Sequence, residues 1–253
     1  MTLTLIGLGL NDEKDITLKG LEAIKNADII YLESYTSILQ TSFENLEKFY
    51  GKKITLANRD VVENKAEQTI LKDAKTKNVA FLVIGDIFGA TTHTDLVLRA
   101  KQQNIEVKYV HNTSILTAVG ETGLQLYKFG KTTSIPFDNH NVEAPYNVVK
   151  QNKSLNMHTL ILLDLNPEQN KFLTINQAIE YFLRMEEKKK ENVINNKTIF
   201  IACARLGSSE GIIKAGTEKQ LPNIDFGKPP YCLIIPGDLH FLEEEFLEMF
   251  KAV

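Results

Sequence analysis

One stretch of this sequence places a carboxylate beside a loop of small and hydroxyl-bearing residues. An unbroken apolar run over residues 79–84 stops at Gly85 and Asp86, and the loop that follows contains Gly89, Ala90 and two threonines. A fixed carboxylate, several hydroxyls and bare backbone suit a small ligand that has an amino group and hydrogen-bonding edges. The alternative is a tight turn in which Asp86 only stabilises the backbone.

The apolar run before Asp86 indicates how this loop is positioned. The run is too short for a lone helix and too apolar for an edge strand, so it predicts a strand buried on both faces, as parallel sheets require. Ligands of open α/β sheets bind at the carboxyl ends of such strands, which is where Asp86 is expected. Thr94 precedes an apolar helical pattern, and we expect it to cap the next helix.

The first half of the chain alternates strands with helices. The pattern predicts strands at 2–8, 28–32, 54–56, 79–84 and 106–110, and helices at 17–26, 42–50, 62–78 and 94–104. This alternation is typical of a mostly parallel sheet covered by helices. We place the end of this first α/β domain at residue 112.

The second half of the chain, residues 113–253, has a different pattern and is predicted to form a second α/β domain. Strands are expected at 132–136, 159–165, 198–204 and 232–236, helices from Ile175 and over 242–251, and a polar stretch between the first two strands. Fewer helices for each strand favour a mixed sheet. The sequence therefore predicts an α/β protein of two domains.

A glycine turn after the first predicted strand suggests a dinucleotide site. Gly7 and Gly9 match the start of the fingerprint, and Glu33 is placed to act as the ribose-binding acid. Asp12 occupies the place of the third glycine and Glu13 follows it, so a pyrophosphate would meet carboxylates instead of free amides. This argues against a nicotinamide-linked dehydrogenase.

Composition argues against several other classes. The 253 residues are 43% hydrophobic with a net charge of −3, which predicts a sizeable core and disfavours nucleic acid as the main partner. No apolar run approaches the roughly 20 residues that cross a bilayer, and no signal-like leader opens the chain, so we expect an intracellular protein. Cys203 and Cys232 are expected to be core residues, and no zinc, phosphate or serine-nucleophile motif is present. The reaction class that remains is the transfer of a group from a donor that is already activated.

Segments along essentially the whole chain resemble the diphthine synthase family of methyltransferases. They are GLGLNDEKDITLKG (7–20), YLESYTSIL (31–39), GDIFGATTHTDL (85–96), HNTSILTAVGETGLQLYKFGKTTSIPF (111–137), ARLGSSE (204–210), FGKPPY (226–231) and PGDLHFLEEEFL (236–247). The chain departs from the family at Ile87, where proline is common, and at Gly89, where a larger residue is common. The loss of proline frees the loop slightly, and Gly89 lets the backbone come closer to a ligand.

The resemblance implies a fold and an activity. The family has the tetrapyrrole-methylase type of fold, two α/β domains with S-adenosylmethionine held in the cleft between them. Its members methylate the amino group of a 3-carboxy-3-aminopropyl side chain on a histidine of translation elongation factor 2, a step of diphthamide biosynthesis. We therefore expect a cytoplasmic homodimer that uses S-adenosylmethionine, needs no metal, and binds neither membranes nor nucleic acid directly.

The resemblance also implies which residues contact S-adenosylmethionine. These are Leu10, Asp86, Gly89, Ser114, Ile115, Leu165, Leu206 and Tyr231. Chemistry supports Asp86, because a carboxylate suits a ligand with sulfonium and ammonium groups, and Ser114, because it precedes an apolar segment that can begin a helix. The leucines are equally explained as ordinary core residues.

Two questions stay open at this stage. The substrate amine must lose a proton before it attacks a methyl group, and Glu121 is a candidate acceptor, although a helix-end role explains it equally well. The chain is alternatively a methyltransferase of the same fold with another substrate, such as a corrin, a porphyrin or ribosomal RNA. A noncatalytic S-adenosylmethionine-binding module is the remaining alternative.

Overall fold

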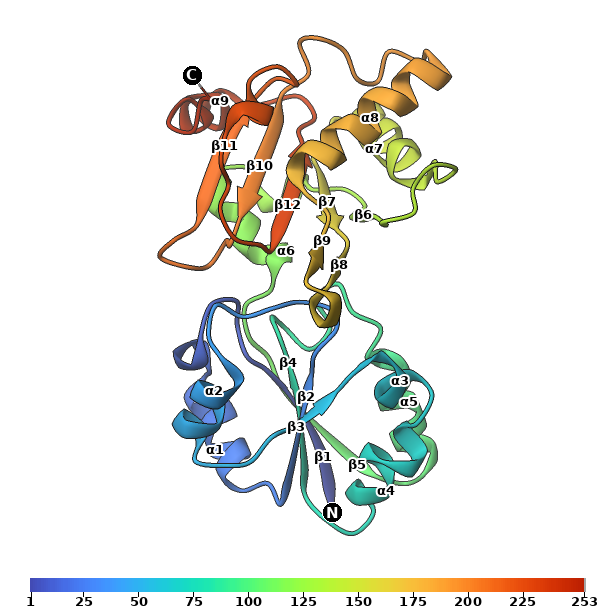
Figure 1. The fold of residues 1–253 in the computed structure, drawn as a ribbon, viewed down its shortest axis with the longest axis vertical. Helices are drawn as coiled ribbons and strands as arrows, with labels where there is room; N and C mark the ends of the chain where they lie inside the picture. The colour runs from blue at the N-terminus through green and yellow to red at the C-terminus, as the bar shows by residue number, and fades with distance from the viewer. Residues whose placement is uncertain (253) are drawn as a thin grey trace. The chain divides into compact units, whose positions relative to one another are not determined.

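The computed structural model of the chain describes residues 1–252. Internal contacts divide the chain into two compact units, Met1–Leu116 and Thr117–Val253. Each unit combines a sheet with helices (Figure 1). The domain boundary predicted after residue 112 stays a prediction.

The first unit is built on a five-stranded sheet in which every pairing is parallel. The strand order is β3-β2-β4-β1-β5, and the strands are β1 (Thr2–Gly7), β2 (Ile29–Glu33), β3 (Thr55–Ala57), β4 (Val79–Val83) and β5 (Glu106–Val110). β4 carries the apolar run and lies in the middle of the sheet, with all its residues buried. The predicted parallel sheet is confirmed.

Helices cover both faces of this sheet. α1 (Leu18–Lys25) and α2 (Phe43–Tyr50) lie on one face, and α3 (Arg59–Glu63), α4 (Ile70–Ala74) and α5 (Thr94–Gln102) lie on the other (Figure 1). Side chains of β4 alternate between the two cores, so that Phe81 packs with α3 to α5 and Leu82 with α1 and α2. Because burying one large apolar side chain contributes about 1.5–3 kcal/mol, this alternation fixes the register of β4.

The two central strands lead to helices on opposite faces of the sheet. β1 is followed by α1, whereas its neighbour β4 is followed by α5 on the other face. The two loops therefore diverge at the carboxyl edge, which is the position where open α/β sheets bind ligands. Asp86 follows β4 at this position.

Two local predictions in the first unit are wrong. The helix predicted at 62–78 is divided into α3, a 3₁₀ helix η2 (Ala66–Gln68) and α4. The backbone leaves the helical conformation at Lys65, with φ −116° and ψ 11°, and again at Thr69, with φ −122° and ψ −98°. Thr94 does not cap α5: it is the first helical residue, and His93 takes the position before it. The buried His93 ring instead packs edge-on against Phe81, with 5.3 Å between the ring centroids.

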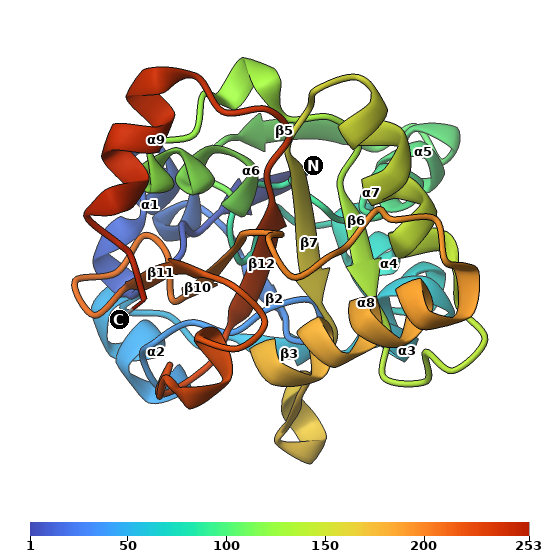
Figure 2. The same cartoon turned by 90° about the horizontal axis from the view of Figure 1, so that it is seen from above.

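The second unit contains a five-stranded mixed sheet in the order β11-β10-β12-β7-β6 (Figure 2). Its strands are β6 (Thr133–Ile135), β7 (Thr159–Leu163), β10 (Phe200–Ala204), β11 (Ile212–Gly216) and β12 (Tyr231–Ile235). β6 pairs with β7 in parallel, and the other three pairings are antiparallel. The predicted mixed sheet is confirmed, although β11 was not predicted.

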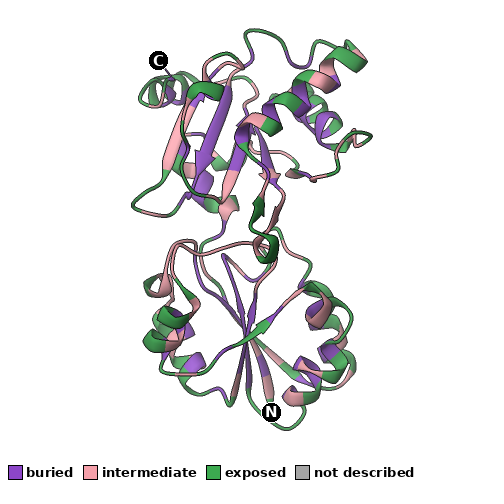
Figure 3. Cartoon of the chain, in the orientation of Figure 1, coloured by how far each residue is buried: buried purple, intermediate pink, exposed green. Residues whose placement is uncertain are grey.

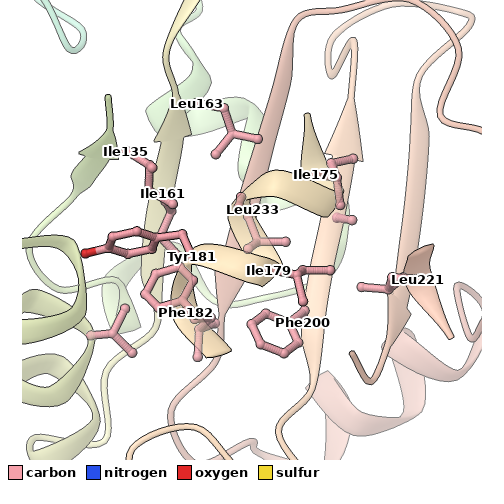
Figure 4. Packing of buried hydrophobic residues seen from close by; sticks show 14 of the residues in the cluster. Ile135, Ile161, Leu163, Ile175, Ile179, Tyr181, Phe182, Phe200, Leu221 and Leu233 are labelled. Atoms are coloured by element: carbon pink, nitrogen blue, oxygen red, sulfur yellow. The ribbon is translucent and has the colours of Figure 1, made fainter. Parts of the chain in front are cut away.

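The core of the second unit lies between this sheet and two helices. α8 (Ile175–Lys189) places Ile179 and Phe182 beside Phe200 and Leu233 of the strands (Figure 4). α7 (Ala144–Ser154) adds the buried Tyr146. Buried residues run along the central strands of both units (Figure 3).

Two further predictions in the second unit are wrong. The segment between the first two predicted strands contains α7, which was missed because polar residues dominate it while Tyr146, Val148 and Val149 are buried. The strand predicted at 159–165 ends at Leu163, and a hairpin of β8 (Leu165–Asn166), η5 (Pro167–Gln169) and β9 (Lys171–Phe172) follows it.

A buried carboxylate holds the last helix, α9 (Phe241–Glu248), in the second unit. The Glu243 carboxylate accepts hydrogen bonds from His158 Nε2, at 3.0 Å, from Lys128 Nζ and from the backbone N–H of Gln125 and His240. Burial by itself raises the pKa of Glu243, but these hydrogen bonds outweigh it and lower the pKa to about 2. The remaining short helices are η1 (Glu13–Asp15), α6 (Ile115–Ala118), η3 (Val119–Thr122), η4 (Leu126–Lys128) and η6 (Leu221–Asn223).

Candidate functional site

The loops after β1 and β4 are joined by their backbones. Leu8 N–H donates to the Val83 carbonyl at 2.9 Å, and Gly9 and Gly85 exchange two hydrogen bonds, with N···O distances of 3.2 and 2.7 Å. The two backbone segments thus stay paired beyond the last residues of β1 and β4. This pairing gives the following loops a fixed starting point at the centre of the sheet edge.

The Asp86 carboxylate organises the loop after β4. Its Oδ2 accepts hydrogen bonds from His111 Nδ1 at 2.9 Å and from Asn112 N–H at 3.0 Å, and its Oδ1 accepts from Phe88 N–H at 3.1 Å. Partial burial raises the pKa of Asp86, but the hydrogen bonds outweigh burial and leave the pKa below its ordinary value. The carboxylate is therefore ionised at neutral pH, and Oδ1 retains room for another donor.

Gly89 lies directly against Ser114. A Cβ atom on Gly89 would be 2.5 Å from Ser114 Cβ and 2.8 Å from its Oγ, so any other residue would push the two segments apart. Ser114 is buried, its Oγ accepts a hydrogen bond from Leu116 N–H at 3.2 Å, and α6 begins with Ile115. The predicted helix start after Ser114 is confirmed.

Leu10 joins the same group of residues. The place that a Gly85 Cβ would take lies 3.8 Å from both Leu10 Cδ2 and Ser114 Cα. Asp15 holds the turn, because its Oδ2 accepts from the N–H groups of Leu10 at 3.1 Å and Asn11 at 2.8 Å. The structure therefore brings together the predicted residues of the first unit, which are Leu10, Asp86, Gly89, Ser114 and Ile115.

The same contacts bear on the dinucleotide interpretation. The Leu10 and Asn11 amides, which a pyrophosphate would need, are occupied by Asp15. Glu33 is fully buried, and its carboxylate accepts from the N–H groups of Tyr35 and Thr36. Neither the turn nor the acidic residue is free to bind a nicotinamide nucleotide.

The predicted residues of the second unit lie at one edge of its sheet. Tyr231 begins β12 and pairs with Ala204, the last residue of β10, while Leu206 follows β10. Leu165 follows the end of β7, which runs antiparallel to β12. Leu165, Leu206 and Tyr231 therefore form a second group within their own unit.

Comparisons with known proteins agree with these two sheets. A family model described as Tetrapyrrole (Corrin/Porphyrin) Methylases matches residues 2–222. The chain belongs to the tetrapyrrole methylase family. A protein named diphthine methyl ester synthase from Dictyostelium discoideum is 47% identical over 271 residues, which cover 100% of this chain and 99% of that protein. A diphthine synthase from Methanocaldococcus jannaschii is also 47% identical, over 251 residues and 97% of each chain.

A crystal structure of diphthine synthase supports the same relationship. It superposes on this tetrapyrrole methylase with a TM-score of 0.91 and 38% identity, and the match covers 99% of this chain and 96% of that chain. The protein is therefore a methyltransferase that groups with the diphthine synthases within its family.

Sequence reasoning missed two polar residues of this tetrapyrrole methylase. His111 follows β5 and bonds Asp86, and its place at the end of a predicted strand was an available signal. Arg205 is buried after β10, and its side-chain partners within residues 1–252 are backbone oxygens, which no sequence pattern reports. Glu121, the candidate proton acceptor, accepts a hydrogen bond from Gly207 N–H at 3.0 Å, which gives it a structural role.

The described residues, 1–252, offer neither a metal site nor a membrane-spanning segment. They contain no group of three or more histidine, cysteine, aspartate or glutamate residues arranged to hold a metal ion. No helix among them is long and apolar enough to cross a membrane. Cys203 and Cys232 face each other across β10 and β12 as buried free cysteines.

Proposed function

We propose that this methyltransferase is a diphthine synthase. It transfers methyl groups from S-adenosylmethionine to the amino group of the 3-carboxy-3-aminopropyl histidine of translation elongation factor 2. The observation that carries the proposal is the match of nearly the whole chain, at 47% identity, to two relatives from distant organisms whose names both refer to diphthine. The match to the Dictyostelium relative covers 100% of this chain and 99% of that protein.

The residues of the first unit suit S-adenosylmethionine. The ionised Asp86 offers an acceptor to a ligand that carries positive charge on its sulfonium and ammonium groups. Gly89, which is partly exposed, lets the loop after β4 pack directly against Ser114, a contact that a Cβ would prevent. Leu10 adds an apolar side chain at the same edge, suited to the adenine ring. We assign Leu10, Asp86, Gly89, Ser114 and Ile115 to the cofactor.

The resemblance to the family adds three residues of the second unit to this assignment. Leu206 is buried, while Tyr231 and Leu165 are partly exposed. Their position at one edge of the mixed sheet supports a shared role. We assign Leu165, Leu206 and Tyr231 to the cofactor as well.

The reaction requires the protein mainly to align the acceptor amine with the methyl group and to allow the amine to lose its proton. When bound, S-adenosylmethionine supplies a methyl group already activated by the positive sulfur. The chain must hold the acceptor amine in line with that methyl group, and such orientation is worth up to roughly 7–11 kcal/mol. The amine must also be neutral, and burial away from water lowers the pKa of an amine.

Mass spectrometry of the substrate protein tests the proposal. Elongation factor 2 that carries the aminocarboxypropyl histidine is incubated with the full chain and S-adenosylmethionine. We expect a ladder of added methyl groups on that histidine, and its loss with the Asp86→Ala variant. No mass change, together with calorimetric binding of S-adenosylmethionine, would contradict this substrate and favour another substrate or a binding module.

A methyl ester is the second candidate product, because the Dictyostelium relative is named diphthine methyl ester synthase. The two relatives are equally identical to this chain, so the number of methyl groups must be counted directly. An ester is removed by mild alkali, whereas methyl groups on nitrogen are not. Treating the product with alkali therefore separates the two outcomes.

The proposed substrate also bears on location and assembly. We propose that the enzyme works in the cytoplasm, where elongation factor 2 acts in translation, and that it is a homodimer, as the resemblance implies. Sedimentation equilibrium of the full chain measures the assembly state. A monomer at micromolar concentration would contradict the dimer without affecting the assignment of the reaction.

A further inference from the structure

Arg205 is a buried cation whose hydrogen-bond partners, among the residues that the structure describes, are backbone oxygens. It follows β10, and only 7% of its surface is exposed. Its Nη1 donates to the carbonyl oxygens of Phe226, at 2.9 Å, and Lys228, and its Nη2 donates to the carbonyl oxygen of Glu210 at 3.0 Å. The guanidinium therefore joins two segments that are distant in sequence, the turn 205–211 and the loop 226–230.

A residue assigned to the cofactor lies within the first segment, and another lies directly after the second. Leu206 lies in the turn 205–211, and Tyr231 follows the loop 226–230 directly. The Tyr231 hydroxyl donates to the carbonyl oxygen of Gly227, which lies between the two loop residues that the guanidinium binds. Arg205 thus fixes the acceptor that sets the direction of the Tyr231 ring.

The backbone around Leu206 is held on both sides. Arg205 N–H donates to the Pro230 carbonyl at 2.9 Å, and Gly207 N–H donates to the Glu121 carboxylate at 3.0 Å. Arg205 itself has φ +51°, a left-handed conformation that residues with a side chain rarely adopt. Such a conformation persists only where its surroundings impose it.

We propose that Arg205 is a positioning residue of the cofactor site, which sets the geometry of Leu206 and Tyr231 by clamping the turn 205–211 to the loop 226–230. The inference rests on the proposed function, because that function assigns these two residues to S-adenosylmethionine. The Nη1 and Nη2 atoms of the guanidinium donate to the protein itself, whereas the buried Nε has no hydrogen-bond partner among the described residues. Recognition of the cofactor is left to the residues that Arg205 holds.

Arginine is the side chain that this arrangement requires. Its planar fork presents donors in fixed directions and can reach several carbonyls at once, whereas the lysine ammonium is a compact point charge on a flexible stem. Gly227 has φ +65°, and a Cβ there would lie 3.3 Å from both Nη1 and Nη2 of Arg205. The loop therefore packs closely on the guanidinium.

The first test is calorimetric binding of S-adenosylhomocysteine to the full chain and to Arg205→Lys. We expect affinity at least about tenfold weaker in the variant, the size that follows from losing hydrogen bonds made by a charged donor. Arg184→Lys is the matched control, because Arg184 is also a partly buried arginine of this unit, bonded to Asn139. Its affinity should stay within about twofold of the unaltered chain.

A second pair of variants keeps the test valid where Arg205→Lys does not fold. Gly227→Ala places a methyl group against the Arg205 guanidinium. Gly51→Ala is its control, because Gly51 also has a left-handed backbone, with φ +68°, but no atom lies within 4 Å of the added Cβ. Both variants carry similar backbone strain. We expect weaker binding only in Gly227→Ala.

The outcomes are separable. Circular dichroism identifies a temperature at which each variant is folded, and affinities are compared there, so that a role limited to stability would lower the melting temperature and leave affinity unchanged. Unchanged affinity in folded Arg205→Lys, or in Gly227→Ala relative to Gly51→Ala, would overturn the positioning role. Failure of the unaltered chain to bind S-adenosylmethionine and S-adenosylhomocysteine would instead overturn the proposed function, and this inference with it.

Discussion

The candidate residues of the two units are held in place by groups of opposite charge. In the first unit, carboxylates accept hydrogen bonds from loop N–H groups: Asp15 from Leu10 and Asn11, and Asp86 from Phe88 and Asn112. In the second unit, the Arg205 guanidinium donates to loop carbonyl groups. Both solutions satisfy backbone groups that the loops would otherwise leave without partners.

The difference concerns what remains for a ligand. Asp86 accepts three hydrogen bonds and still has an acceptor position and a negative charge at the sheet edge, which suits a cationic ligand. The Nη1 and Nη2 atoms of Arg205 donate to backbone carbonyl groups, so its charge stabilises the fold of the loops. For the proposed cofactor assignment, we propose that the residues of the first unit supply the charge that selects the cofactor and that those of the second unit supply shape.

The largest expected effect follows from removing that charge. Asp86→Asn should weaken S-adenosylhomocysteine binding by about 100-fold, because an amide carries no charge and its one carbonyl oxygen cannot accept both from His111 and Asn112 and, on the other side, from Phe88. Calorimetry measures the change. Asp95→Asn, which neutralises an exposed carboxylate paired with Arg99, is the control and should bind normally. Normal binding by Asp86→Asn would remove the distinction between the units.

A carboxylate of the second unit should affect stability without affecting binding. Glu243 lies beyond the end of β12 opposite to Tyr231, and Glu243→Gln should cost roughly 2–3 kcal/mol of unfolding free energy at pH 7. Because the folded-state pKa is lowered to about 2, the stabilisation is present above the unfolded pKa of about 4.5 and is lost as pH falls through 2.

Urea unfolding of Glu243→Gln and of the unaltered chain, at neutral pH and near pH 3, measures this dependence. The difference between the two proteins should shrink at the lower pH. Affinity for S-adenosylhomocysteine should be unchanged at neutral pH, in contrast to Asp86→Asn. A difference in stability that does not depend on pH would contradict the role of the ionised carboxylate.

A smaller effect is expected where the first unit depends on close approach. Gly89→Ala places a methyl group 2.5 Å from Ser114 Cβ, so the loop must move, and affinity should fall by about tenfold. Gly120→Ala is the control, since its Cβ would meet Leu126 at an ordinary distance of 3.6 Å. Equal affinities in the two variants would show that the approach of Gly89 to Ser114 does not shape the site.

The smallest effect is expected at Asp15. Asp15→Asn keeps a carbonyl oxygen that can accept from the Leu10 and Asn11 amides, so affinity should fall only about threefold. Asp15→Ala, which removes the acceptor, should have a larger effect than the amide. Equal losses in both variants would mean that the charge of Asp15, and not its hydrogen bonds, supports the turn.

Much of the first unit could be predicted from the sequence, because its signals are local. The run 79–84 is continuously apolar and ends at Gly85, so both the central strand and the place of Asp86 follow from adjacent residues. The helix predicted at 62–78 was wrong because periodicity does not report the breaks at Lys65 and Thr69.

The second unit was harder to predict, because its determinants are distant in sequence. In the sequence of α7 the buried Tyr146 stands among polar neighbours, so the buried face of this helix is recognisable only once the sheet is present. Arg205 bonds carbonyl groups of residues up to Lys228, and backbone oxygens carry no sequence signal. The resemblance to the family named Leu206 and Tyr231, but it did not indicate what holds them.

The paired glycines at the end of β1 and β4 have a consequence for hydrogen exchange. The N–H groups of Leu8, Gly9 and Gly85 lie outside the strands, yet each donates to a backbone carbonyl of the neighbouring segment. Amide protons exchange with solvent only when such bonds open. The amide protons of these three residues should therefore exchange as slowly as those of the central strands. Slow exchange should extend beyond Gly7 and Val83 into the loops that carry Leu10 and Asp86.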